Sequence, residues 1–136
     1  MKIEKIEDLR ILAVDDERIT LSRIERMLNK LGIDQVVTRG STTEALRFIK
    51  EQDDAIDVVL VDMFMPENDG VDLIIGLKAV GFQGRIAVVS GGDDRMLAGA
   101  EVLARAKGVE ILGTLKKPVS ADDLKAVLGK AVSSTD

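Results

Sequence analysis

The sequence predicts an α/β fold in which helices cover both faces of a five-stranded parallel sheet. Three observations support this class. Five short apolar runs have the length of buried strands, and they alternate with five segments whose apolar residues recur at helical spacing. Glycines stand where three of these helical segments end. Such an alternation implies right-handed crossovers, which make the neighbouring strands parallel.

The first half of the chain contains three expected strands and two expected helices. Residues 10–14 are an apolar run that ends at acids, and residues 18–32 show helical spacing before a glycine. Residues 35–38 form a shorter and more polar run, which favours a strand at an edge of the sheet. Residues 41–49 open with Ser-Thr-Thr-Glu, the spacing of a capping box. Residues 57–61 include four consecutive aliphatic residues, which is typical of a strand buried on both faces.

The second half continues the same alternation. A proline and an Asn-Asp-Gly turn separate the third strand from a helix marked by apolar residues over 73–80. Residues 86–89 are a fourth buried run, and residues 96–108 show helical spacing that ends at a glycine. Residues 109–115 are the fifth expected strand. The last helix, over 120–131, opens with a serine suited to the N-cap position.

Five strands within 136 residues favour the strand order 2-1-3-4-5, a doubly wound, flavodoxin-like arrangement. We expect a single domain over residues 1–136, with a core of about residues 9–130 and a frayed tail at 133–136. Ligands of such sheets bind beyond the carboxyl ends of the strands, where the strand order reverses. Here that point lies after the first and third strands.

Composition excludes several kinds of chemistry. The chain has no cysteine and no histidine, so any metal must be held by oxygen. A formal net charge of −5, no cluster of basic neighbours larger than Lys116-Lys117, and only three aromatic residues argue against nucleic acid as a direct partner. No apolar run is long enough to span a membrane, and the N-terminus lacks the apolar middle of a signal peptide. We therefore expect a cytoplasmic location and no membrane partner.

Polar side chains stand at the ends of four of the five expected strands. Asp15 and Asp16 follow the first strand, Asp62 the third, Ser90 the fourth and Lys117 the fifth. The first and third strands are neighbours about 5 Å apart in the predicted order, so three carboxylates share one crevice. At an effective dielectric constant near 20 and about 5 Å, each like-charged pair costs roughly 3 kcal/mol. Either a raised carboxyl pKa or a bound cation would relieve this repulsion.

We favour the cation, because an all-oxygen cluster open to water suits Mg²⁺. Asp16 and Asp62 would hold the ion, Asp15 would position it, and Lys117 would supply a second positive charge. A free oxygen of Asp62 could then attack a phosphorus atom while the two cations neutralise the transferred oxygens. These residues predict an acyl phosphate on Asp62.

Four blocks of the sequence resemble the signature motifs of response regulator receiver domains of two-component signalling. The resemblance extends from Ile11 to about Leu128, and its blocks are Leu12–Glu17, Val61–Gly70, Val88–Gly91 and Lys117-Pro118. It implies that Asp62 is the phosphorylated aspartate and that Asp15 and Asp16 bind Mg²⁺ together with Asp62. It also implies the backbone carbonyl of Phe64 as a further metal ligand, Ser90 and Lys117 as contacts of the phosphoryl group, and a bond to Pro118 that is often cis.

The resemblance implies partners as well. The phosphodonor would be a sensor histidine kinase or a phosphotransfer protein, and the signal would pass to a downstream protein or an output domain. Such a protein, expected from bacteria, catalyses only its own phosphorylation and dephosphorylation. A homodimer through the face of the fourth helix, fifth strand and fifth helix is left open.

Three positions depart from the usual pattern of the family. Thr114 replaces the aromatic residue that receivers usually carry three residues before the lysine, so we expect the signal to travel through residues 90–92 and the following helix. Phe64 and Gly92 stand where relatives often place groups that orient a hydrolytic water. Neither side chain can hydrogen-bond a water, so we expect slow loss of the phosphoryl group.

Two other functions suit parts of the pattern. Thr114 leaves open a receiver-shaped interaction module that acts without phosphorylation. A Mg²⁺-dependent phosphohydrolase similar to haloacid dehalogenases would also use Asp62 as its nucleophile. Those enzymes carry a second aspartate two residues later, where this chain has Phe64, and a cap for which the chain has no spare length. Each of the polar residues at the strand ends could, taken alone, have a purely structural role. Their joint occurrence at the ends of neighbouring strands favours the receiver.

Overall fold

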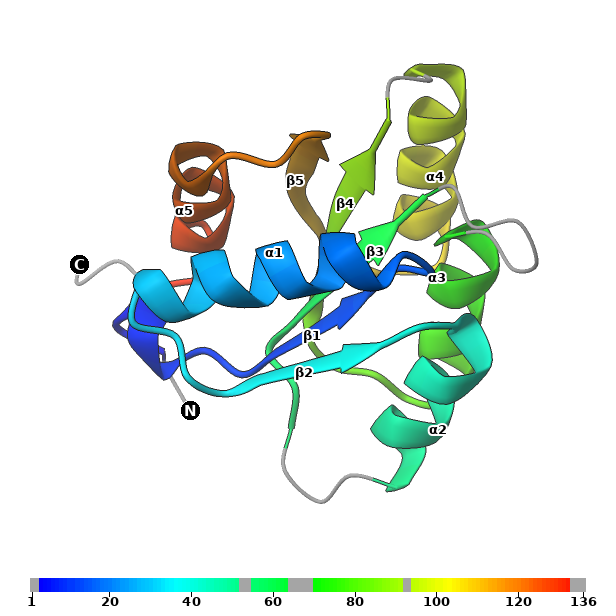
Figure 1. Cartoon of the computed structure of the whole chain (residues 1–136). Coiled ribbons are helices and arrows are strands. Elements are labelled where there is room, and N and C mark those ends of the chain that lie inside the picture. The colour runs from blue at the N-terminus through cyan, green and yellow to red at the C-terminus, as the bar shows by residue number, and fades with distance from the viewer. Residues whose placement is uncertain (1–2, 52–54, 64–69, 92–93, 133–136) are drawn as a thin grey trace.

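The structure is a computed structural model of the chain and describes residues 3–51, 55–63, 70–91 and 94–132. Within them, five strands form one parallel sheet in the order β2-β1-β3-β4-β5 (Figure 1). The strands are β1 (Ile11–Val14), β2 (Val36–Arg39), β3 (Val58–Asp62), β4 (Arg85–Ser90) and β5 (Ile111–Lys116). The predicted fold class and strand order are confirmed.

Helices lie on both faces of this sheet (Figure 1). One face is covered by α1 (Arg18–Lys30) and α5 (Ala121–Gly129), and a short 3-10 helix, η1 (Ile6–Asp8), precedes β1. The opposite face is covered by α2 (Thr42–Glu51), α3 (Gly70–Ala79) and α4 (Asp94–Ala106). Among the described helices, none combines the length and the apolarity needed to cross a membrane.

The central strands supply side chains to two hydrophobic cores. Because successive side chains of a strand point to opposite faces, Val58 and Leu60 of β3 enter the core beneath α1 and α5. Val59 and Val61 enter the core beneath α2, α3 and α4. Each fully buried aliphatic side chain contributes about 1.5–3 kcal/mol, which explains why β3 is an unbroken aliphatic run. The rigid sheet that results holds the strand ends in fixed positions.

Several element boundaries differ from those expected. Asp62 and Ser90 were expected just beyond their strands, but both are the last residues of strands, paired with Val89 and Lys116. Strand pairing is a property of the backbone, so a polar side chain does not end a strand where a neighbouring strand continues to pair with it. Both side chains are therefore anchored more firmly than loop residues would be.

A bulge in β5 determines which way its residues face. Ile86 pairs with Ile111 whereas Ala87 pairs with Gly113, so Leu112 is the additional residue. Gly113 faces α5, since a Cβ placed there would lie 3.4 Å from Val127 Cγ2. Thr114, the next residue, consequently faces the side of the sheet that α4 covers.

Candidate functional site

Three carboxylates converge at the carboxyl edge of the sheet. Val14 of β1 pairs with Val61 of β3, so the residues that follow them, Asp15 and Asp62, lie side by side. Ligand oxygens of Asp15, Asp16 and Asp62 lie within 4.8 Å of one another. Asp15 and Asp62 are only 1% and 2% exposed, whereas Asp16 is open to solvent. The strand order thus produces the acidic crevice that the sequence predicts.

Backbone hydrogen bonds hold the acidic turn after β1. The N–H of Asp15 donates to the carbonyl of Arg39 at 3.2 Å, which ties the turn to the end of β2. The N–H of Glu17 donates to Asp15 Oδ1 at 2.9 Å. Since Glu17 is the N-cap residue of α1, the orientation of Asp15 is coupled to the start of that helix.

Lys117 brings a positive charge into the crevice. Its Nζ lies 3.1 Å from Asp15 Oδ2, 3.4 Å from Asp62 Oδ2 and 3.7 Å from Glu17 Oε1. The backbone N–H of Lys117 donates to the backbone carbonyl of Ser90 at 2.9 Å, so the ends of β4 and β5 are joined at the site. The peptide bond from Lys117 to Pro118 is cis.

Two pKa values reflect this concentration of charge. Desolvation, followed by the negative charge of Asp15, raises the pKa of the Asp16 carboxyl above its usual value. Burial acts to lower the pKa of Lys117, but a hydrogen bond with Asp15 and the charges of Asp62 and Asp15 outweigh it, so the pKa of Lys117 is raised. Lys117 thus offsets part of the repulsion among Asp15, Asp16 and Asp62, and a bound cation would relieve the rest.

The donor set matches a hard divalent cation. Three carboxylates of mixed burial, with oxygens close enough to share one ion, are ligands that Mg²⁺ accepts while it keeps part of its water shell. Asp15, Asp16 and Asp62 would hold such an ion. The further ligand that the resemblance implies, the backbone carbonyl of Phe64, lies outside the described residues.

Of the remaining predicted residues, Ser90 and Thr114 lie on strands of the sheet. Ser90 is buried, 5% exposed, at the end of β4, which lies between β3 and β5. Thr114 is half-buried on β5 and pairs with Val88. Gly92, like Phe64, lies outside the described residues, so the expected effect of these two residues on phosphoryl lifetime stays a prediction.

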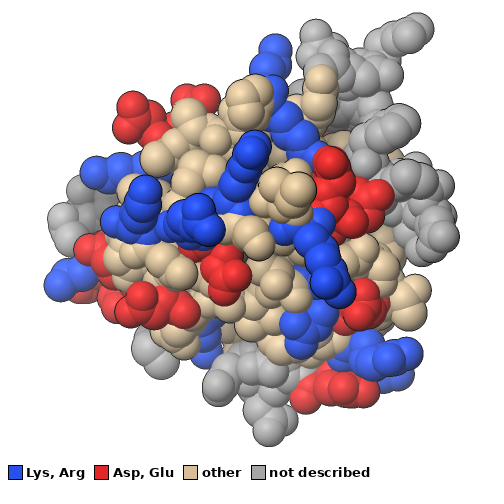
Figure 2. All heavy atoms as spheres, in the orientation of Figure 1, with Lys and Arg blue, Asp and Glu red and all other residues tan. Residues whose placement is uncertain are grey.

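The outer face of α1 carries a basic stripe that the sequence interpretation missed. Arg23, Arg26 and Lys30 recur at helical spacing and are exposed, and the exposed apolar side chain of Ile19 precedes them on the same face. Figure 2 shows basic side chains gathered across the face of the molecule that α1 occupies. These residues are not adjacent in the sequence, and the stripe becomes visible only at the 3.6-residue period of the helix.

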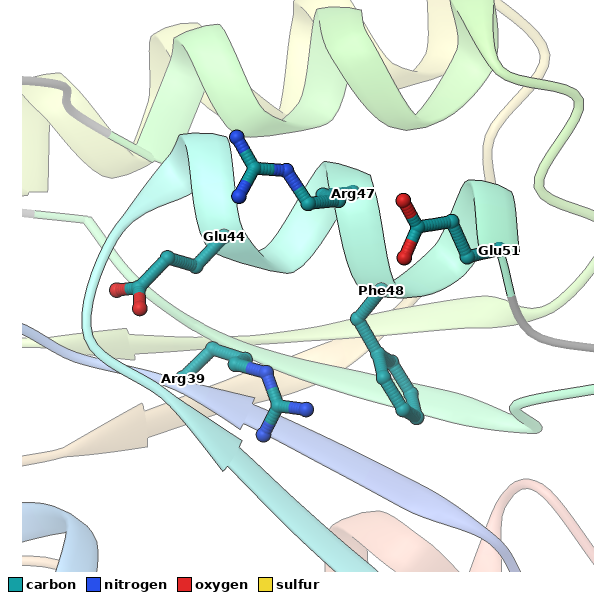
Figure 3. A pocket seen from close by; sticks show the side chains of 5 residues that line it. All are labelled: Arg39, Glu44, Arg47, Phe48 and Glu51. Atoms are coloured by element: carbon teal, nitrogen blue, oxygen red, sulfur yellow. The ribbon is translucent and has the colours of Figure 1, made fainter.

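One surface hollow includes a residue of the site, and a second lies at an edge of the sheet. The first, of about 370 Å³, lies between α1 and the segment after β5; its lining includes Arg23, Met27, Lys117 and Val119. The second, of about 330 Å³, lies at the β2 edge of the sheet (Figure 3). It is lined by Arg39, Glu44, Arg47, Phe48 and Glu51.

In the second hollow, Arg39 reaches from β2 towards the ring of Phe48 on α2 (Figure 3). The guanidinium carbon lies 4.8 Å from the ring centroid, a cation–π distance. One guanidinium nitrogen also donates to the carbonyl of Thr38 at 2.8 Å.

The strand order and the position of the charged cluster define a class, the doubly wound α/β proteins with a charged site at the point where the strand order reverses. Within that class, residues 11–129 match the family model for the response regulator receiver domain. The chain belongs to this family, whose members are signalling domains of two-component systems.

Curated relatives and solved structures agree with this assignment. The chain is 35% identical over 121 residues to the two-component response regulator ARR11 of Arabidopsis thaliana, covering 88% of this chain and 22% of that protein. It is 31% identical over 121 residues to response regulator ORR24 of Oryza sativa subsp. japonica, covering 88% of this chain and 18% of that protein. The chain therefore spans about a fifth of the length of these relatives. Because both are plant proteins, they do not support the expected bacterial source.

Among solved structures, a response regulator receiver domain protein from Clostridium thermocellum aligns with a TM-score of 0.76 at 33% identity, over 91% of this chain and 94% of that one. A response regulator receiver protein from Pseudomonas putida aligns with a TM-score of 0.75 at 29% identity, over 90% of this chain and 96% of that one.

Proposed function

We propose that this receiver accepts a phosphoryl group on Asp62 in a Mg²⁺-dependent reaction and thereby changes its interaction with a downstream protein or an output domain. The observation that carries the proposal is the cluster of Asp15, Asp16 and Asp62 at the carboxyl edge of the sheet, where Lys117 pairs with Asp15 and Asp62. Phosphoryl transfer depends chiefly on positioning and on neutralising charge, and this arrangement supports both.

Each residue has a defined part in the reaction. A carboxylate oxygen of Asp62 attacks phosphorus as the phosphorus–nitrogen bond of a phosphohistidine breaks; the electron pair returns to the ring nitrogen, which takes up a proton. Asp15, Asp16 and Asp62 would hold Mg²⁺, which would supply positive charge to the transferred oxygens. Lys117 exchanges its contact with Asp62 for one with a phosphoryl oxygen, and the hydroxyl of Ser90 donates to another.

The phosphodonor, a sensor histidine kinase or a phosphotransfer protein, must approach from the side of α1. Lys117 lines the hollow that α1 borders, so a protein seated there reaches the site directly. Ile19, 70% exposed on α1, offers an apolar contact, and Arg23 and Arg26 favour an acidic partner surface.

The outgoing signal leaves by another side of the domain. A threonine at position 114 lacks the aromatic ring that would turn inward, so the change at Ser90 passes to α4 through the segment that follows β4. Structures with and without a phosphate mimic test this route, which is wrong if α4 and the preceding segment keep their positions. A homodimer through α4, β5 and α5 remains a prediction.

One experiment tests the proposed reaction. The protein is incubated with acetyl phosphate and Mg²⁺, and the intact mass is measured. We expect one phosphoryl group per chain, lost in Asp62→Asn and in EDTA. No adduct under any condition would favour the interaction module suggested by Thr114, and release of phosphate without an adduct would favour a hydrolase.

A further inference from the structure

Glu17 is a carboxylate at the site that the proposed function does not use. Its Oε1 lies 3.7 Å from Lys117 Nζ, and its side chain is 66% exposed. It is not one of the three acids whose oxygens could share a metal ion. Lys117 therefore has three carboxylate partners, of which Asp15 and Asp62 belong to the metal group and Glu17 does not.

The difference between Glu17 and the two metal-binding partners of Lys117 affects the lysine when a divalent cation is bound. The cation and the ammonium of Lys117 draw on the same two carboxylates, Asp15 and Asp62, and the two positive charges repel each other. A lysine held only by those carboxylates would be displaced towards solvent. Glu17 reaches Lys117 from the solvent side, and its carboxylate stays available when the metal group is filled.

We propose that Glu17 is a positioning residue, which holds the ammonium of Lys117 beside the acidic cluster while a divalent cation occupies Asp15 and Asp62. The inference rests on the proposed function in so far as it requires that cation. It adds that Lys117 and the cation are compatible because a third carboxylate, outside the metal group, stabilises the lysine.

The first test is a double-mutant cycle on Mg²⁺ affinity, measured by calorimetry with the metal alone. Exposed ion pairs alter equilibria by up to about five-fold, so we expect Glu17→Gln to weaken Mg²⁺ binding about three-fold. In a Lys117→Met background the same change should have almost no effect, because there is no lysine to hold. Equal weakening in both backgrounds would mean that Glu17 acts only through its general field, which would overturn the proposal.

A second variant separates contact from charge. Glu17→Asp keeps the negative charge but is one methylene shorter, so it should lose the contact and behave as Glu17→Gln does. Affinity equal to that of the unchanged protein would again point to a field effect. The matched control is Glu110→Gln, which removes an exposed glutamate paired with Arg85 away from the acidic cluster and should leave Mg²⁺ affinity unchanged.

The position of the lysine is observed directly by NMR of its ¹⁵N-labelled ammonium group. In the Mg²⁺-loaded protein we expect a slowly exchanging Lys117 signal that Glu17→Gln accelerates at least two-fold. An exchange rate independent of Glu17 would refute the role. Lack of Mg²⁺ binding by the unchanged protein would overturn both the proposed function and this inference, whereas undiminished Mg²⁺ binding by Glu17→Gln would overturn only the latter.

Discussion

Neutralising Asp62 should stabilise the metal-free protein although it removes the proposed phosphoacceptor. At 4.8 Å, the upper limit of the oxygen separations, and an effective dielectric constant near 20, repulsion from Asp15 and Asp16 costs about 3.5 kcal/mol each. The attraction between Asp62 Oδ2 and Lys117 Nζ, which lie 3.4 Å apart, stabilises the folded state by about 5 kcal/mol. The difference is about 2 kcal/mol against folding, and solvent screening of exposed Asp16 reduces it to about 1–2 kcal/mol.

The assay is urea unfolding at pH 7 in EDTA, followed by circular dichroism because the chain has neither tryptophan nor tyrosine. We expect Asp62→Asn to raise the free energy of unfolding by about 1–2 kcal/mol, and added Mg²⁺ to stabilise the unchanged protein more than the variant. The control Asp34→Asn, at an exposed position outside the site, should stay within about 0.5 kcal/mol. An Asp62→Asn protein less stable than the original in EDTA would refute the view that carboxylate repulsion dominates here.

Three further predictions follow from the same charges. Lys117→Met removes the ammonium that pairs with Asp15 and Asp62, so the free energy of unfolding by urea in EDTA should fall by about 2 kcal/mol, and Mg²⁺ should restore it. An unchanged free energy of unfolding would contradict a stabilising role of these ion pairs. The raised pKa of Asp16 means that its ionised form opposes folding, so Asp16→Asn should be more stable than the original protein at pH 7. This difference in stability should shrink as the pH falls through that pKa, and a difference that grows in acid would contradict a raised pKa. Arg23→Glu should slow phosphoryl transfer from a histidine-phosphorylated protein several-fold at low salt and leave labelling by acetyl phosphate unchanged, whereas Lys78→Glu on α3 should affect neither; equal slowing with both donors would argue against docking on α1.

The fold was predictable because the pattern that identifies it is also the pattern that stabilises it. A strand buried between two layers of helices favours aliphatic residues on both faces, and Val58–Val61 of β3 show this directly. The ends of the strands were less predictable, since Asp62 and Ser90 remain in the sheet through pairing with neighbouring backbones. Side-chain polarity carries no information about that pairing.

The convergence of Asp15 and Asp62 followed from strand order alone, because equivalent positions on neighbouring parallel strands lie side by side. The contact between Lys117 and Glu17 could not be predicted in this way. It depends on the direction that a long, flexible side chain takes from the end of β5 towards α1, and no periodicity encodes that direction.

Arg39 has a consequence for how this domain behaves at high concentration. β2 is the first strand in the order of the sheet, and strands at a sheet edge are templates for intermolecular pairing and aggregation. The Arg39 guanidinium covers the carbonyl of Thr38 and is held over Phe48, so a four-residue strand presents a charge where an incoming strand would need an acceptor. Pairing of another strand with the outer edge of β2 at Thr38 is therefore disfavoured.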